Sequence, residues 1–184
     1  MPTLPLVDAA RELKGAALVQ ALRKGGYNLY MRHALQFPPE EKEDCSKPAL
    51  KPQGIEEVDQ VSTALRSLKI PVGRVLSSEP CRNRETARRM GLGEVELTKK
   101  LNAGSDTGGV PPGEARRNLL GASPKPGSNT ILVSHIHGGN DRADWMHLEL
   151  METIVYAPNE GKPIPVARIR REAWAALIAL ASAP

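Results

Sequence analysis

The chain has 184 residues, of which 40% are hydrophobic, 25% charged and 3% aromatic, so we expect one soluble domain with an aliphatic core. Its formal charge of +4 raises the question of nucleic-acid binding, but acidic residues are interspersed with the basic ones and few aromatic rings are available to stack on bases. We therefore interpret the positive excess as affinity for small anions, with nucleic acid as a minor alternative.

No segment approaches the roughly 18 consecutive apolar residues of a membrane span, and the N-terminus lacks the pattern of a signal peptide. The sequence as it stands predicts neither insertion nor export, although a chain whose cleaved signal had been replaced by a methionine would look the same. Cys45 and Cys81 fit either two reduced thiols or one bridge formed in an oxidising compartment.

In the first part of the chain, the pattern of residues predicts two helices, one strand and an exposed loop. Asp8 is placed to cap a helix over residues 9–24 that ends at Gly25, and residues 27–31 read as a strand. Residues 36–52 are rich in proline and include the charged run Glu40–Asp44, which we interpret as a solvated face. Apolar residues at spacings of three and four then predict a helix that ends before Pro71, with one stripe formed by Ile55, Val58, Val61, Leu65 and Leu68.

The rest of the chain alternates short apolar runs with helical segments. We predict strands at 72–77, 94–97, 131–134, 153–156 and 166–169, and helices at 82–90, 114–120 and 171–183; residues 102–130 otherwise read as loop. This alternation predicts a single α/β domain over residues 1–184, a three-layer sandwich with a mostly parallel central sheet and helices on both faces.

Four reactive side chains follow three of the predicted strands. They should converge because ligands bind beyond the carboxyl ends of parallel strands; they are Arg32, His33, Arg82 and His135. Two guanidinium groups match the oxygens of a phosphate dianion, and Arg82 would lie in the first turn of a helix, where an anion is favoured. The cations would lower the pKa of His33 and keep it a neutral nucleophile, while a protonated His135 would stabilise the equatorial oxygens.

These segments resemble the signatures of the histidine phosphatase superfamily, which includes phosphoglycerate mutases and acid phosphatases. Residues 29–34 match a strand followed by Arg-His-Gly, with Ala34 in place of glycine; residues 77–87 match Ser-Ser-Pro-x-x-Arg-x-x-x-Thr-Ala, with the proline displaced by one; residues 131–135 match an apolar strand followed by Ser-His.

The resemblance spans roughly residues 20–175 and implies a phosphoglycerate mutase-like fold. It also implies a phosphatase without metal or cofactor, acting on a small phosphorylated substrate or binding inorganic phosphate. His33 would be the nucleophile, and the phosphate pocket would consist of Arg32, Arg82 and His135.

The proton donor to the leaving oxygen is not identified by the resemblance. Ile136 stands directly after the second histidine, where many members carry an acidic residue; Asp106 and Glu152 are alternative candidates. Similarity to small exported bacterial members implies a bridge between Cys45 and Cys81 that ties the long loop over the pocket. It therefore favours a periplasmic or secreted protein whose signal was removed, with a cytoplasmic location as the alternative.

Three other functions remain open. A metallohydrolase could use a cluster that follows the last signature, formed by His135, His137, Asp141, Asp144 and His147, although its spacing matches no common metal motif. Ala34 and the missing acid are compatible with a non-catalytic anion-binding protein of the same fold. A mutase-like phosphotransferase is the third, and the compact chain favours a phosphatase over it. The sequence predicts neither the substrate nor the oligomeric state.

Overall fold

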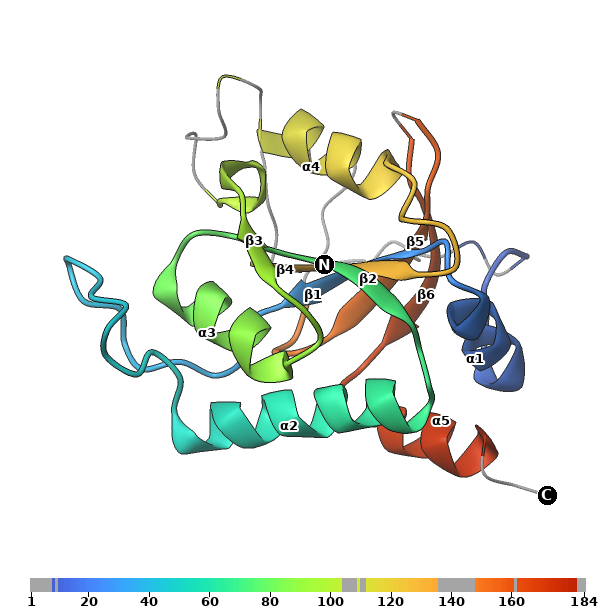
Figure 1. Cartoon of the computed structure of the whole chain (residues 1–184), viewed down its shortest axis with the longest axis horizontal. Coiled ribbons are helices and arrows are strands. Elements are labelled where there is room, and N and C mark those ends of the chain that lie inside the picture. The colour runs from blue at the N-terminus through green and yellow to red at the C-terminus, as the bar shows by residue number, and fades with distance from the viewer. Residues whose placement is uncertain are drawn as a thin grey trace.

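The centre of the molecule is a six-stranded sheet with the strand order β3-β2-β4-β1-β5-β6 (Figure 1). This computed structural model describes residues 8, 10–103, 109, 112–135, 148–160 and 162–181. The strands are β1 (Asn28–Arg32), β2 (Val72–Ser77), β3 (Val95–Leu97), β4 (Asn129–Ser134), β5 (Thr153–Ala157) and β6 (Ile164–Ile169). Strands β1, β2, β3 and β4 pair in parallel, whereas β5 pairs antiparallel with both β1 and β6, so the predicted mostly parallel sheet is confirmed.

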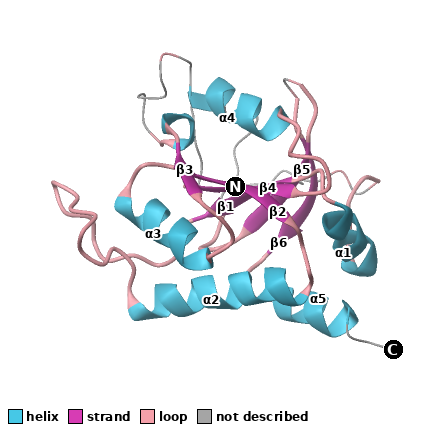
Figure 2. Cartoon of the chain, viewed as in Figure 1, coloured by secondary structure: helices cyan, strands magenta, loops and turns pink. Residues whose placement is uncertain are grey.

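Helices cover both faces of the sheet (Figure 2). On one face a large apolar core joins the sheet to α1 (Gly15–Lys24), α2 (Pro52–Ser67), α3 (Cys81–Met90) and α5 (Ala173–Ala181). The other face packs against α4 (Pro112–Gly121) and the short helix η1 (Lys99–Leu101). Successive side chains of a strand point to opposite faces, so Leu29 and Met31 enter the first core and Tyr30 enters the second. The three-layer sandwich is therefore confirmed.

The first helix is shorter than the sequence predicts. Helix α1 begins at Gly15 instead of residue 9, and the Asp8 carboxylate accepts a hydrogen bond from the Ala10 amide, at 3.0 Å, within a turn that precedes the helix. The Leu13 amide donates to the Val166 carbonyl of β6 at 2.7 Å. Because this segment pairs with the sheet, it cannot also extend the helix. The end of α1 agrees with the prediction, since Gly25 has a φ of 79°.

The segment between β1 and α2 projects from one side of the molecule (Figure 1). Its two ends meet in an isolated antiparallel bridge between Gln36 and Leu50. Helix α2 begins just beyond and lies very close to the chain leaving β1, because an added Cβ on Gly54 would be 2.1 Å from the Leu35 carbonyl oxygen. A glycine at this position therefore allows α2 to pack directly under the chain that carries His33.

No helix among the described residues is both long and apolar enough to cross a membrane.

Candidate active site

The structure brings the three sequence signatures to one edge of the sheet. Strands β1, β4 and β2 are adjacent and parallel, with Arg32 in register with Ser134 and Ser77 in register with Val133. The His33 amide donates to the Ser134 carbonyl at 3.1 Å. The four predicted side chains consequently start from neighbouring points of the backbone.

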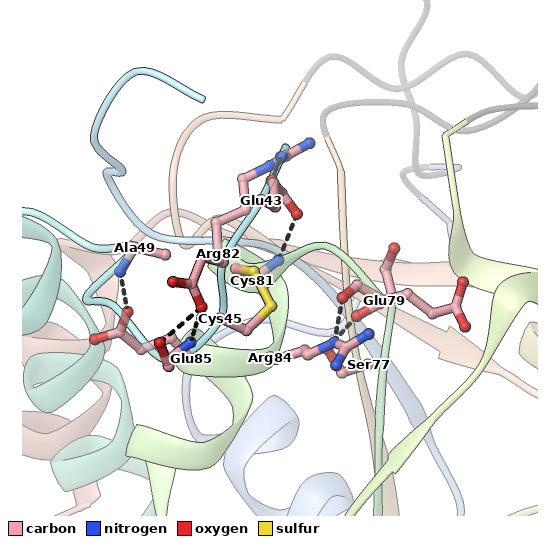
Figure 3. Close-up of a disulfide and its surroundings, with 12 residues drawn as sticks. Glu43, Cys45, Ala49, Ser77, Glu79, Cys81, Arg82, Arg84 and Glu85 are labelled. Carbon is pink, nitrogen blue, oxygen red and sulfur yellow. Dashed lines mark hydrogen bonds and ion pairs between the residues drawn. A yellow bond between two sulfur atoms is a disulfide. The ribbon is translucent and has the colours of Figure 1, made fainter. Parts of the chain in front are cut away.

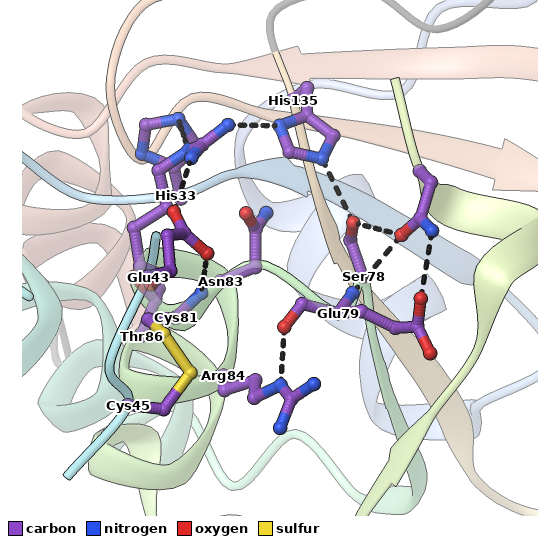
Figure 4. Close-up of polar contacts among 12 residues, drawn as sticks. His33, Glu43, Cys45, Ser78, Glu79, Cys81, Asn83, Arg84, Thr86 and His135 are labelled. Carbon is purple, nitrogen blue, oxygen red and sulfur yellow. Dashed lines mark hydrogen bonds and ion pairs between the residues drawn. A yellow bond between two sulfur atoms is a disulfide. The ribbon is translucent and has the colours of Figure 1, made fainter. Parts of the chain in front are cut away.

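Arg82 joins the two histidines through different nitrogens of its guanidinium group (Figure 4). Its Nε lies 3.2 Å from Nε2 of His33, and its Nη2 lies 3.3 Å from Nδ1 of His135. The two imidazole rings are 6.0 Å apart between centroids and nearly perpendicular, at 73°. The guanidinium group of Arg82 thus lies between the two imidazole rings. A tetrahedral oxyanion bound here could contact both the guanidinium and the imidazoles.

His33 is held in the tautomer that a nucleophile needs. Its Nδ1 lies 2.8 Å from the Ala34 carbonyl oxygen, and because a carbonyl only accepts, Nδ1 carries the proton and Nε2 keeps its lone pair. Burial lowers the pKa of His33 to about 4, an effect to which the charges of Arg82 and Arg32 add. The ring is therefore neutral at pH 7, with Nε2 facing Arg82.

His135 is held by a chain of polar contacts from the opposite side. Its Nε2 lies 2.8 Å from the Ser78 hydroxyl, which in turn donates to Oδ1 of Asn102 at 2.9 Å. Burial, followed by the charge of Arg82, lowers the pKa of His135 to about 3. The sequence predicts a protonated ring here, whereas the pocket residues by themselves favour the neutral one; a protonated ring requires the charge of a bound dianion.

Arg32 presents a second guanidinium group at the same edge. Its Nη1 donates to the Leu148 carbonyl at 2.8 Å, while its Nε is buried and has no hydrogen-bond partner among the described residues. Burial and the neighbouring Arg82 lower the pKa of Arg32. A buried donor of this kind is what a bound anion would satisfy.

Residues of the second signature lock the turn that carries His33. The Thr86 hydroxyl donates to the Arg82 carbonyl at 2.7 Å and accepts from the Ala34 amide at 3.2 Å, and the Asn83 side chain donates to the Ser134 carbonyl at 2.7 Å. Ala34 is fully buried and is not among the residues with positive φ. An alanine therefore fits where the family signature has glycine.

Of the two proton-donor candidates named from the sequence, Asp106 lies outside the described residues. So do Ile136 and four members of the alternative metal cluster, namely His137, Asp141, Asp144 and His147. The described residues contain no group of three potential metal ligands.

Glu152, the other candidate, is fully buried. Its Oε2 accepts from Nη2 of Arg168 and from the Glu149 amide, at 2.9 and 2.8 Å, and its Oε1 accepts from Nε of Arg168 at 2.5 Å. Both carboxylate oxygens are engaged by these donors, so the contacts of Glu152 are those of a structural ion pair beside β1.

A different carboxylate reaches the pocket. Oε1 of Glu43 lies 3.2 Å from Nη1 of Arg82, and its Oε2 accepts from the Cys81 amide at 2.9 Å (Figure 3). The run Glu40–Asp44 is exposed, as the sequence predicts, but Glu43 within it also contacts Arg82, which the interpretation as a solvated face does not include. The position of Glu43 depends on a disulfide between Cys45 and Cys81, whose Cα atoms are 5.1 Å apart. The only sequence signal for this contact is the nearness of Glu43 to Cys45 once that bridge is assumed.

No family model and no curated protein matches this sequence, but solved structures share its fold. The protein histidine phosphatase SixA, in complex with tungstate, superposes with a TM-score of 0.58 at 16% identity over 79% of this chain and 97% of SixA. A phosphoserine phosphatase variant from Entamoeba histolytica, in complex with phosphoserine, gives 0.52 at 14% identity over 79% and 98%. The chain therefore shares its fold with these two phosphatases, which agrees with the fold that its three sequence segments predict.

Proposed function

We propose that the protein is a metal-independent phosphatase that hydrolyses phosphomonoesters through a phosphohistidine on His33. The observation that carries this proposal is the neutral His33 ring, whose Nε2 lone pair faces the guanidinium of Arg82 at 3.2 Å. A nucleophile held beside a phosphate-binding cation is the arrangement that covalent phosphoryl transfer requires. The complexes of the two similar folds, one with tungstate and one with phosphoserine, support a site for tetrahedral oxyanions.

The proposed reaction has two steps. Nε2 of His33 attacks phosphorus, the P–N bond forms and the bond to the leaving oxygen breaks as that oxygen takes a proton. Water then attacks the phosphohistidine, the P–N bond breaks, and phosphate leaves while Nε2 recovers its lone pair. Arg32 and Arg82 would neutralise the equatorial oxygens in both steps, and His135 would donate to them once the dianion has restored its proton.

Turnover of p-nitrophenyl phosphate by the purified protein tests the proposal. We expect activity in the wild type, insensitivity to a chelator, and loss of activity in His33→Ala with an unchanged circular dichroism spectrum. Acid-labile label on the wild type, but not on His33→Ala, should be trapped after quenching with a radiolabelled ester.

Other results would favour the alternatives. Inactivity towards varied phosphomonoesters across pH would indicate a non-catalytic anion-binding protein. Loss of activity with chelator would indicate a metallohydrolase, and transfer of label to an acceptor alcohol in preference to water would indicate a mutase-like phosphotransferase.

We also propose that the protein works in an oxidising compartment, the periplasm or the cell exterior. The support is the disulfide between Cys45 and Cys81, which links the projecting segment to α3; such bonds persist where thiols are not kept reduced. Alkylation of the protein in intact cells, followed by mass spectrometry, should find both cysteines protected. Free thiols in the cell would favour the cytoplasm.

A further inference from the structure

We propose that Glu43 is the proton donor to the leaving oxygen, and that the cavity beside it receives the alcohol part of the substrate. The inference rests on the proposed function and supplies the acid that the family signatures do not identify.

The Glu43 carboxylate bridges two groups that attract a phosphate. One oxygen contacts Nη1 of Arg82 at 3.2 Å, and the other accepts from the backbone amide of Cys81, the first residue of α3, at 2.9 Å. Its side chain is one-third exposed, at 33%. Among the described residues, Glu43 is the carboxylate whose contacts reach the guanidinium that also faces both histidines.

A cavity of about 270 Å³ opens on the outer side of this contact. Both Glu43 and Arg82 line it, so it begins where the phosphate pocket ends. Apart from Cys81, the rest of the wall comes from the projecting segment and combines apolar rings with charged groups, including Phe37, Pro39, Pro48 and Lys47. An ester with its phosphoryl group on Arg82 and its alcohol part in this cavity would place the bridging oxygen next to the Glu43 carboxyl.

Covalent and hydrogen-bonded anchors fix Glu43 with respect to Arg82. The disulfide joins Cys45, two residues after Glu43, to Cys81, the residue before Arg82. At the far end of the segment, the Glu85 carboxylate of α3 accepts from the amides of Ala49 and Leu50 at 2.6 and 3.1 Å. The carboxyl and the guanidinium are therefore held on the same helix terminus, which gives the constant geometry that proton transfer requires.

A bound substrate changes the partners of the carboxylate. A phosphate dianion on Arg82 would face Glu43, and two anions at hydrogen-bonding distance favour the sharing of one proton. In the first step the Glu43 carboxyl gives its proton to the leaving oxygen as the P–O bond breaks. In the second step the resulting carboxylate accepts a proton from the attacking water as the P–N bond breaks, so the acid is restored when phosphate leaves.

Esters with different leaving groups separate this role from a structural one. The p-nitrophenolate ion is stabilised and leaves without a proton, whereas the alcohol of benzyl phosphate requires one; the two esters carry a ring of similar size. We expect Glu43→Gln to lower kcat/KM for benzyl phosphate by about 100-fold or more, with little change for p-nitrophenyl phosphate. Glu43→Asp should recover part of the rate for benzyl phosphate.

Glu41→Gln is the matched control, since it removes the same charge from the same run without lining the cavity. This variant should leave kcat/KM unchanged for both esters. Equal losses for both esters in Glu43→Gln, or no loss for benzyl phosphate, would overturn the role of Glu43 and leave the proposed function standing. Inactivity of the wild type towards both esters would overturn the proposed function and this inference together.

Discussion

At the scale of single residues, the pocket is dominated by two neutral histidines packed around one arginine. Burial contributes most to the low pKa values of His33 and His135, and Arg82 contributes further. Both rings are therefore kept unprotonated by the same environment that prepares the site for a dianion. Such an arrangement favours substrate binding and makes the folded state sensitive to acid.

This sensitivity predicts a pH-dependent stability. Both histidines have an ordinary pKa of 6.5, lowered in the folded protein to about 4 and about 3. Below pH 6.5 the unfolded chain binds protons that the folded chain does not, so the unfolding free energy should fall as the pH is lowered from 6.5 through this range. Since one pKa unit corresponds to about 1.4 kcal/mol, the loss is at most roughly 3 kcal/mol for His33 and roughly 5 kcal/mol for His135.

Urea denaturation at a series of pH values measures this loss. The double variant His33→Asn, His135→Asn should show a flatter dependence between pH 6.5 and 4 than the wild type. The assignment to these two rings is wrong if the two curves are parallel.

At the scale of elements, the position of His33 depends on how α2 meets the chain leaving β1. Gly54 permits the contact, the Lys51 amide donates to the Leu35 carbonyl at 3.0 Å, and the Leu35 amide donates to the buried Glu57 carboxylate at 3.0 Å. Helix α2 and the turn that carries His33 thus form one packed unit, so we expect a change in α2 to displace His33, which lies two residues before Leu35.

We therefore expect Gly54→Ala to destabilise the protein by about 1–3 kcal/mol, the usual range for overpacking, and to reduce phosphatase activity. The added Cβ would lie 2.1 Å from the Leu35 carbonyl oxygen, and the backbone must move to relieve this contact. Thermal denaturation together with turnover of p-nitrophenyl phosphate checks both effects. The neighbouring Gln53→Ala, at an exposed position of the same helix, is the control; indistinguishable variants would contradict the packing argument.

Predictions from the sequence agree best with the structure where a local pattern of residues is sufficient to place an element or a side chain. Arg32, His33, Arg82 and His135 could be placed together because each follows a strand of a parallel sheet, and the apolar stripe of α2 was evident from its spacing. The start of α1 was not, because Leu13 pairs with Val166 from a distant strand.

The contact between Glu43 and Arg82 could not be predicted for a related reason. Nothing in a charged, proline-rich run indicates which of its carboxylates contacts Arg82. The path of the segment is set by the disulfide and by the hydrogen bonds to Glu85. Asn102 was also missed, since its contact with Ser78 joins two loops that share no motif.

At the scale of the whole molecule, the disulfide closes a loop of 36 residues that runs from the projecting segment through α2 and β2 to the start of α3. In the chain-entropy model, a loop of this length stabilises the folded state by about 4 kcal/mol. We expect reductant to lower the urea midpoint of the wild type correspondingly. The double variant Cys45→Ser, Cys81→Ser should begin at the lower midpoint and not respond to reductant; an equal response of both proteins would show that the effect arises elsewhere.

The bridge between Gln36 and Leu50 has a consequence for how this scaffold can be changed. Because both ends of the projecting segment meet in this bridge, the residues between them other than Glu43 and Cys45 can vary in length and composition at a small cost in loop entropy, while the sheet that carries the histidines stays intact. Changing the polarity of lining residues such as Phe37, Pro39 and Lys47, with Glu43 and Cys45 kept, is accordingly a route to new ester preferences that leaves the four pocket residues unaltered.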